Sequence, residues 1–311
     1  MNYEMSADKR TTEVVDTCCA SCGKEEVDDV KMKPCDGCDL VRYCSDTCKE
    51  DHRSEHEVKC KERAAELRDE ILFKQPESTH HGDCPLCCVP LSLEDGKRVL
   101  YPCCSKVICN GCSYADNARQ WEQKGQQPTC PFCRHPVPET REEFYKIGMK
   151  RVAANDPAAM RQMGAKHFRK GEYDSSFKYW TKAAELGDAV AHYNISAMYR
   201  NGQGVEKDET KKIFHLEEAA IRGHPQARHI LGRYVVKKDN FDRAVKHWII
   251  AASIGDDHSI TALKGCYKHG FVSKEVFAAA LRAHHAAVNA TKSPQREAAA
   301  RAIAGKTGEV L

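Results

Sequence analysis

Seventeen of the eighteen cysteines in this 311-residue chain lie between Cys18 and Cys133, and only Cys266 lies beyond them. Many form Cys-x2-Cys pairs, the spacing of thiolates that share a metal ion. The amino terminus has no basic start followed by an apolar stretch, so we expect no secretory signal and no disulfide framework. The cysteine-rich region therefore predicts bound zinc in an intracellular protein, either cytoplasmic or nuclear.

Composition divides the chain into regions. The two cysteine-rich segments have few aliphatic residues and are too small to bury a stabilising core, so metal ligation must supply their folding free energy. The expected order is a zinc finger at 18–60, a helix and linker at 61–83, a second zinc finger at 84–134, a connecting helix at 135–154, helical repeats at 155–290 and a tail at 291–311. The tail has low hydrophobicity, which predicts a frayed helix or disorder.

The first cysteine cluster offers eight soft ligands. Two Cys-x2-Cys pairs are followed by a Cys-x3-Cys pair and by His-x3-Cys. Eight ligands make two tetrahedral zinc sites without an open position, and such closed sites are structural. The predicted ligands are Cys19, Cys22, Cys35, Cys38, Cys44, Cys48, His56 and Cys60. Replacing Cys19 by Cys18, or His56 by His52, is an alternative that breaks the spacing.

This spacing, with the segment VRYCSDTC at 41–48, resembles the MYND zinc finger. The resemblance implies interleaved sites, with Cys19, Cys22, Cys44 and Cys48 on one ion and Cys35, Cys38, His56 and Cys60 on the other. Similar MYND domains bind proline-rich peptides through a Gln and a Trp, but Lys49 and Arg53 occupy those positions here. Because the apolar indole wall is missing, we expect a protein-binding or architectural finger without the usual proline-rich ligand.

The second cluster begins with CPLCCVPL and ends with CPFCRHPVP, and it resembles the RING domain, the zinc cross-brace of many ubiquitin ligases. The resemblance implies one site of Cys84, Cys87, Cys109 and Cys112, and another of Cys104, Cys130, Cys133 and one further ligand. Lys106 stands where RING domains commonly have a histidine, and its ammonium has no lone pair for a metal. Cys103 is the nearest substitute, with His135, His81 or no fourth ligand as alternatives. We therefore expect four zinc ions, or three without that site.

Four further residues carry the functional hypothesis for this cluster. In ligases resembling this chain, apolar residues at the positions of Leu86, Trp121 and Pro131 dock the ubiquitin-conjugating enzyme. An arginine at the position of Arg134 hydrogen-bonds both that enzyme and ubiquitin. The RING would then act by positioning a thioester for attack by a substrate lysine. The alternative is that Leu86 and Trp121 only cover the zinc sites and that Arg134 is an ordinary exposed arginine.

From Asn155 onward the sequence repeats itself. EYDSSFKYWTKAAELG at 172–187 matches NFDRAVKHWIIAASIG at 240–255, and a unit between them ends at Gly223. Proline at first helical positions and glycine at helix ends are typical of helix pairs. These ends and the loop NGQGVEKD at 201–208 resemble Sel-one-like repeats, relatives of the tetratricopeptide family. We predict a solenoid of antiparallel helix pairs, with a degenerate fourth unit at 256–288, that binds proteins.

Several other side chains are expected to have structural roles. Aromatic and methionine residues at helical spacing usually fill a core, and we assign this role to Trp180, Trp248, Met160, Met163 and Met198. The pairs His80-His81 and His284-His285 are isolated from other ligands, so we expect them to be solvated.

The expected fold class is multi-domain, with two small zinc-stabilised α+β domains followed by an all-α solenoid. Lys+Arg 48 against Asp+Glu 45 and the acidic run at 24–30 argue against nucleic-acid binding. No apolar run is long enough for a membrane span. MYND-bearing methyltransferases need a large catalytic domain, for which these modules leave no room.

Two classes of function remain. The first is a RING-type ubiquitin ligase that positions a charged ubiquitin-conjugating enzyme against a substrate held by the repeats. The second is a non-enzymatic adaptor in which the fingers and repeats are docking surfaces for proteins. The apolar-plus-arginine set in the second cluster favours the ligase, because an adaptor does not need it.

Overall fold

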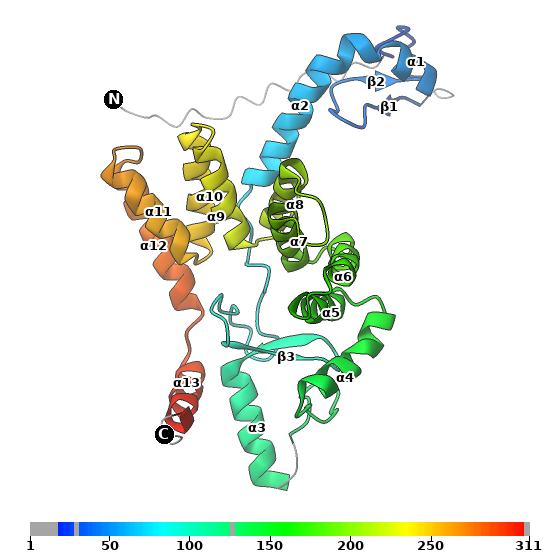
Figure 1. The fold of residues 1–311 in the computed structure, drawn as a ribbon. Helices are drawn as coiled ribbons and strands as arrows, with labels where there is room; N and C mark the ends of the chain where they lie inside the picture. Colours follow the sequence, from blue (N-terminus) through cyan, green and yellow to red (C-terminus); the bar gives the residue numbers. More distant parts are fainter. Residues whose placement is uncertain (1–17, 28–30, 125–127, 308–311) are drawn as a thin grey trace. The chain divides into compact units, whose positions relative to one another are not determined.

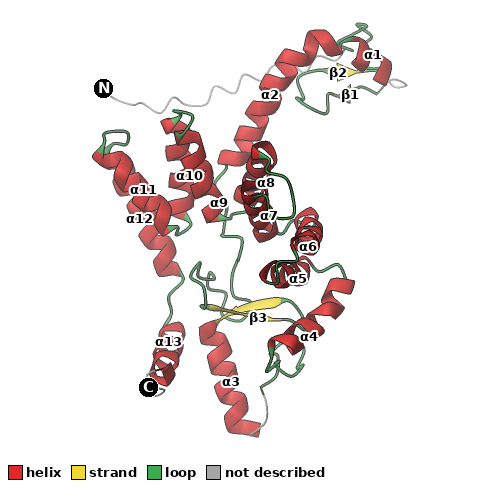
Figure 2. Cartoon of the chain, viewed as in Figure 1, coloured by secondary structure: helices red, strands yellow, loops and turns green. Residues whose placement is uncertain are grey.

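The computed structural model describes residues 18–27, 31–124 and 128–307 (Figure 1). The chain divides into two compact units between Leu72 and Phe73. Within these described ranges helices predominate, and the strands form two short hairpins (Figure 2). None of the helices in the described ranges is both long and apolar enough to span a bilayer.

The first unit contains the first cysteine cluster. Strand β1 (Lys33–Pro34) pairs antiparallel with β2 (Arg42–Tyr43), and helices α1 (Asp46–Asp51) and α2 (Arg53–Phe73) follow. The buried core is formed by Cys19, Met32 and Tyr43. A core of this size buries too little apolar surface to hold a fold without further bonds. The helix expected within 61–83 begins earlier, at Arg53, so that it includes the last two predicted ligands, His56 and Cys60.

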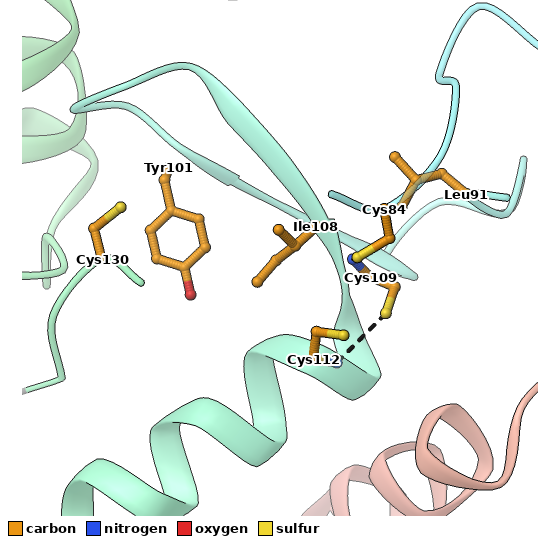
Figure 3. Close-up of a cluster of buried hydrophobic side chains, with 7 residues drawn as sticks. All are labelled: Cys84, Leu91, Tyr101, Ile108, Cys109, Cys112 and Cys130. Carbon is orange, nitrogen blue, oxygen red and sulfur yellow. Dashed lines mark hydrogen bonds between the residues drawn. The ribbon is translucent and has the colours of Figure 1, made fainter. Parts of the chain in front are cut away.

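The second cysteine cluster opens the second unit. Strands β3 (Arg98–Tyr101) and β4 (Lys106–Cys109) form an antiparallel hairpin in which Tyr101 pairs with Lys106, and α3 (Asn110–Lys124) follows directly. Leu91, Tyr101 and Ile108 are buried among the cysteines of this module (Figure 3). The apolar core therefore lies between the two groups of sulfur atoms.

The rest of the second unit is helical. After α4 (Arg141–Ala153), eight helices form four consecutive pairs: α5 (Pro157–Arg169), α6 (Tyr173–Glu185), α7 (Ala189–Asn201), α8 (Glu209–Ile221), α9 (Pro225–Val236), α10 (Phe241–Ser253), α11 (Asp257–Lys268) and α12 (Lys274–Ala290). Each helix packs against the next along the chain. Gly187, Gly223 and Gly255 have positive φ angles just beyond the second helix of a pair, the conformation that ends a helix without strain. The predicted small zinc-binding region followed by a helical solenoid is confirmed.

Tryptophan and glycine interlock within two of these pairs. Trp180 and Trp248 each donate the indole N–H to a backbone carbonyl of the preceding helix, at 3.1 Å and 3.2 Å. A Cβ atom at Gly164 or Gly232 would lie 2.4 Å from the indole ring of the same pair. Each ring therefore occupies the space that the glycine leaves. The expected core role is confirmed for the buried residues Trp180, Trp248, Met160, Met163 and Met198.

The intervening pair solves the same packing problem with other residues. Ser196 occupies the position of the two glycines and Leu216 that of the two tryptophans, counted from the start of the first helix and the end of the second. Both side chains are buried. Serine is larger than the glycine of the other pairs, and leucine is smaller than their tryptophan. The two side chains at these positions therefore share one limited volume.

The tail corrects one expectation. Residues Pro294–Thr307 form helix α13, which packs against α3, and Ala299 is completely buried. The expectation of a frayed or disordered tail is therefore wrong for this range. Low hydrophobicity was misleading because α13 buries a small residue, Ala299, and brings the backbone of Arg296 close to Gly111 of α3, so the contact needs no large apolar side chains.

The expectation that the two histidine pairs are solvated is also wrong for most of their members. His284 is only 7% exposed, and its Nε2 lies 2.9 Å from Asp257 Oδ1. The His80 ring stacks on the ring of His224 with centroids 4.3 Å apart. Of the four residues only His285 is exposed as expected, since His81 is half-buried. Ring stacking and a carboxylate partner offset the loss of hydration at these positions.

Candidate metal centres

The structure gathers the predicted ligands of the first cluster into two groups of four. One group is Cys19, Cys22, Cys44 and Cys48, and the other is Cys35, Cys38, His56 and Cys60. Within each group the ligand atoms all lie within 4.8 Å of one another. These are the interleaved sets that the MYND resemblance implies. Four soft donors around one point fit a closed tetrahedral zinc site.

Local geometry explains why the alternative ligands are not in these groups. His56 and Cys60 are four residues apart on α2 and therefore lie on one face of the helix, and His56 Nε2 is 3.0 Å from Cys38 Sγ. His52 lies outside the group, with its Nδ1 3.1 Å from the Tyr43 hydroxyl. Cys18 forms a β-bridge with Glu25 through its backbone and is not in the first group, which contains the neighbouring Cys19.

The two positions that bind peptides in similar MYND domains have other surroundings here. Lys49 forms an ion pair with Asp36, and Arg53 is exposed at the start of α2. Neither side chain offers a flat apolar wall for a proline ring. The expectation that this finger lacks the usual proline-rich ligand stays a prediction.

Four of the five Cys-x2-Cys pairs share one backbone turn, and the fifth, Cys109–Cys112, spans the end of β4 and the start of α3. The residue that follows the second cysteine has a positive φ angle and donates its N–H to the carbonyl oxygen of the first cysteine, at 2.8–3.3 Å. These residues are Gly23, Asp39, Cys88 and Arg134. The turn places both sulfur atoms of a pair on the same side of the backbone. It also explains why the exposed Cys88, despite standing next to Cys87, is not part of a group.

The second cluster also forms two groups with ligand atoms within 4.8 Å, and the pairs of the two groups alternate along the chain. The first group is Cys84, Cys87, Cys109 and Cys112. The backbone N–H of Cys109 donates to Cys84 Sγ at 3.4 Å, and that of Cys112 donates to Cys109 Sγ at 3.4 Å (Figure 3). The end of β4 and the first turn of α3 thus supply both ligands and donors to the sulfur atoms.

The other group consists of Cys103, Cys104, Cys130 and Cys133, with Cys104 Sγ 3.6 Å from Cys130 Sγ. Adjacent cysteines can both face it because they lie in the tight loop between β3 and β4, where Ser105 has a φ of 56°. Lys106 starts β4 and is exposed. His135 lies outside the group, with Nδ1 2.9 Å from the carbonyl oxygen of Pro136. Cys103 is thus the candidate ligand that the structure places with the other three.

The protonation of these thiols also fits a bound cation. Burial alone would raise the pKa of Cys19, but backbone N–H groups of Cys22 and Cys44 outweigh it and lower the pKa to about 6. The Cys22 side chain and burial raise the pKa of Cys44 to about 12. Sulfur atoms this close cannot all ionise unless a cation lies among them, and Zn²⁺ supplies that charge. The MYND finger and the other cysteine groups are therefore compatible with several bound zinc ions.

The four docking candidates differ in exposure. Leu86 is 44% exposed and Trp121 is 64% exposed. Arg134 is also exposed, while Pro131 is half-buried. Phe132, which sequence reasoning did not select, is exposed as well. It could have been found, because CPFC places Phe132 where CPLC places Leu86.

We expect Cys103→Ser to lower the zinc content of the purified chain by one ion, because oxygen is a poor substitute for the fourth thiolate. Cys88→Ser is the matched control, since Cys88 is exposed and outside every group, and it should retain the full content. Zinc per chain measured by atomic emission, or by native mass spectrometry, decides the outcome. Equal zinc content in the two variants would show that Cys103 is not a ligand.

Comparison with known families identifies two parts of the chain. A family model for the MYND finger matches residues 19–60, and one for the Sel1 repeat matches residues 157–188, 189–224 and 228–256. Among solved structures, a Sel1 repeat protein from Oxalobacter formigenes is similar, with 22% identity, a TM-score of 0.43 and coverage of 50% of this chain and 67% of that one. The antigen c5321 of uropathogenic Escherichia coli has 21% identity, a TM-score of 0.38 and coverage of 61% and 40%.

Curated relatives match over shorter shares of their length. The DAP3-binding cell death enhancer 1 of Mus musculus is 26% identical over 175 residues, covering 43% of this chain and 34% of the relative. The putative beta-lactamase HcpC of Helicobacter pylori is 34% identical over 56 residues, covering 18% and 19%. The chain thus spans about a third of the mouse relative and about a fifth of the bacterial one. It contains a MYND zinc finger and Sel1 repeats, which are protein-interaction domains.

Proposed function

We propose that this chain is a RING-type ubiquitin-protein ligase. The module from Cys84 to Val137 would dock a ubiquitin-conjugating enzyme, and the helical repeats would hold the substrate. The observation that carries the proposal is the exposure of Leu86 and Trp121 beside two alternating cysteine groups. Alternation of this kind is the order of ligands in a cross-brace.

The exposed apolar side chains are informative because they lie in a module with a very small core. Burying a leucine or aromatic side chain contributes about 1.5–3 kcal/mol to the free energy of folding. A module with so small a core therefore loses stability by leaving such side chains exposed. Large aromatic side chains at a surface typically anchor a partner. Phe132 adds a further exposed ring on the opposite Cys-x2-Cys turn.

The proposed mechanism is positioning. Closed metal groups with four protein ligands leave no open position for water or substrate, so they fix the two turns that carry Leu86 and Phe132. Arg134 follows the last cysteine, and its backbone is fixed by the hydrogen bond from its N–H to the Cys130 carbonyl at 2.9 Å. Its exposed guanidinium would hydrogen-bond the carrier enzyme and ubiquitin together, which favours a reactive orientation of the thioester.

We expect Leu86→Ala to abolish ubiquitin-chain formation by the purified protein with activating and conjugating enzymes, because it removes an apolar anchor of the docking surface. The matched control is Leu186→Ala, which truncates a leucine of similar exposure, 49% against 44%, outside this module. Its activity should equal that of the unmodified chain. Zinc content measured on the same samples separates loss of docking from loss of folding. Inactivity of the unmodified chain with a broad panel of conjugating enzymes would reject the ligase.

A non-enzymatic adaptor is the second candidate. The mouse relative is named for its binding to another protein, DAP3, and the MYND finger and Sel1 repeats of this chain are interaction domains. In this case the repeats would bind a partner protein, and the exposed residues of the second cluster would bind another. Capture of a partner by residues 155–290, with no ubiquitin transfer by the full chain, would favour this function.

A further inference from the structure

The carboxyl-terminal helix α13 lies directly against α3, far from it in sequence (Figure 1). At the contact, a Cβ atom on Gly111 would lie 2.9 Å from the backbone nitrogen of Arg296. Only glycine leaves enough space for the backbone of α13 at this distance. Gly111 stands between Cys109 and Cys112, two members of the group formed by Cys84, Cys87, Cys109 and Cys112. The contact therefore places the first turn of α13 beside that group.

Arg296 uses this placement to contact the first Cys-x2-Cys turn of the module. Its Nη2 donates to the carbonyl oxygen of Val89 at 2.9 Å and lies 3.5 Å from Cys87 Sγ. Its Nη1 donates to the carbonyl oxygen of Pro90 at 2.6 Å and to that of Thr291 at 2.7 Å. One guanidinium thus joins α13 to a cysteine sulfur and to the chain that follows it.

The Val89 carbonyl has a second role, because it also accepts the backbone N–H of Cys84 at 3.0 Å. That hydrogen bond closes the turn that presents Cys84 and Cys87. Arg296 therefore holds the acceptor that shapes this turn, as well as one of its two sulfur atoms. A rigid partner that orients metal ligands from outside typically changes metal affinity 10–100-fold when it is removed.

Charge gives Arg296 a further effect. Four thiolates around one Zn²⁺ leave a net negative charge on a group whose members Cys84, Cys109 and Cys112 are buried. A permanently charged guanidinium next to that group offsets part of the cost of burying it. A neutral side chain at position 296 could keep some hydrogen bonds, but it would not supply this charge.

We propose that helix α13 is an integral part of the Cys84, Cys87, Cys109 and Cys112 metal site, and that Arg296 is a positioning residue for it. Arg296 fixes the turn that carries two of the ligands and neutralises part of the charge of the metal–thiolate group. The proposal goes beyond ubiquitin transfer and does not depend on it.

The test compares Arg296→Gln with Arg301→Gln in the full zinc-loaded chain. Arg301 is an exposed arginine of the same helix, so the two variants change the same charge. Zinc transfer to a chromogenic chelator is followed over time, and newly reactive cysteines are identified by alkylation and peptide mass spectrometry. We expect Arg296→Gln to release zinc from this group about 10-fold faster, with alkylation concentrated at its four cysteines. Arg301→Gln should behave like the unmodified chain.

A second variant, Gly111→Val, keeps the arginine and displaces the helix that carries it. We expect the same selective alkylation, because the backbone approach of α13 is blocked. Release kinetics of Arg296→Gln equal to those of Arg301→Gln would overturn the proposal. Alkylation that spreads equally to Cys103, Cys104, Cys130 and Cys133 would also overturn it, since the effect would then be global unfolding.

Discussion

Removal of zinc by a strong chelator is expected to unfold residues 18–60 and 84–137, while helices α5–α12 remain folded. Structural zinc contributes about 10–16 kcal/mol to the folding of small zinc fingers, far more than their small cores supply. The repeats have their own buried core of tryptophan, alanine and leucine side chains. Hydrogen exchange with and without chelator, read peptide by peptide, measures the two parts separately.

The control for this experiment is re-addition of zinc under reducing conditions, which should restore protection in both cysteine-rich segments. Persistent protection of these segments after complete metal removal would contradict the prediction. Linkage of their cysteines into disulfides in the native protein would contradict it too, because the sulfur atoms would then not be available as ligands.

Substitution within the Gly232–Trp248 pair is expected to have the second-largest effect. Trp248→Leu leaves a cavity, and Gly232→Ser forces a side chain into the indole ring, so each alone should destabilise the repeats by about 1–3 kcal/mol or more. The double variant reproduces the Ser196–Leu216 combination of the neighbouring pair. It should therefore be more stable than the sum of the single effects predicts.

Urea denaturation of the zinc-loaded chain, followed by helical circular dichroism, gives the free-energy changes for this comparison. Gly265→Ser is the matched control, because a Cβ at that helical glycine meets no neighbouring atom. Strict additivity of the two single substitutions would mean that the glycine and the tryptophan do not share one volume. The equivalent pair Gly164–Trp180 provides an independent repetition in the first repeat.

Sequence spacing alone was sufficient to select the residues that come together in the MYND finger. Ligands such as Cys19 and Cys22 are close in sequence and sit on a turn with a fixed shape, so their count and spacing are informative. The pairing of helices could also be predicted from the sequence, because Trp180 and Trp248 occupy equivalent positions of two repeats. The spacing of the ligands is a local pattern and the recurrence of tryptophan is a periodic one, so both can be recognised in a single sequence.

Other features depend on contacts that one sequence does not display. The sequence selected Cys103 as the nearest substitute for a fourth ligand but left other candidates open. Placing Cys103 with the other three cysteines depends on the tight β3–β4 loop, in which Ser105 adopts a positive φ angle without being a glycine. The contact between Arg296 and Cys87 joins residues at opposite ends of the second unit, and neither residue has an unusual local pattern. The buried His284 depends in the same way on Asp257, from the preceding helix.

The segment that connects α2 to the Cys84 module lies along the repeats. The Lys74 carbonyl accepts from Arg228 Nη2 at 3.3 Å, Gln75 Oε1 accepts from Ser253 Oγ at 3.0 Å, and His80 donates its N–H to the Gly223 carbonyl at 3.1 Å. These hydrogen bonds hold the segment against the repeats, so it does not act as a flexible linker. The distance between a substrate bound to the repeats and a conjugating enzyme docked at Leu86 would therefore be fixed. Only substrate lysines that lie at this distance from the repeats would then be modified.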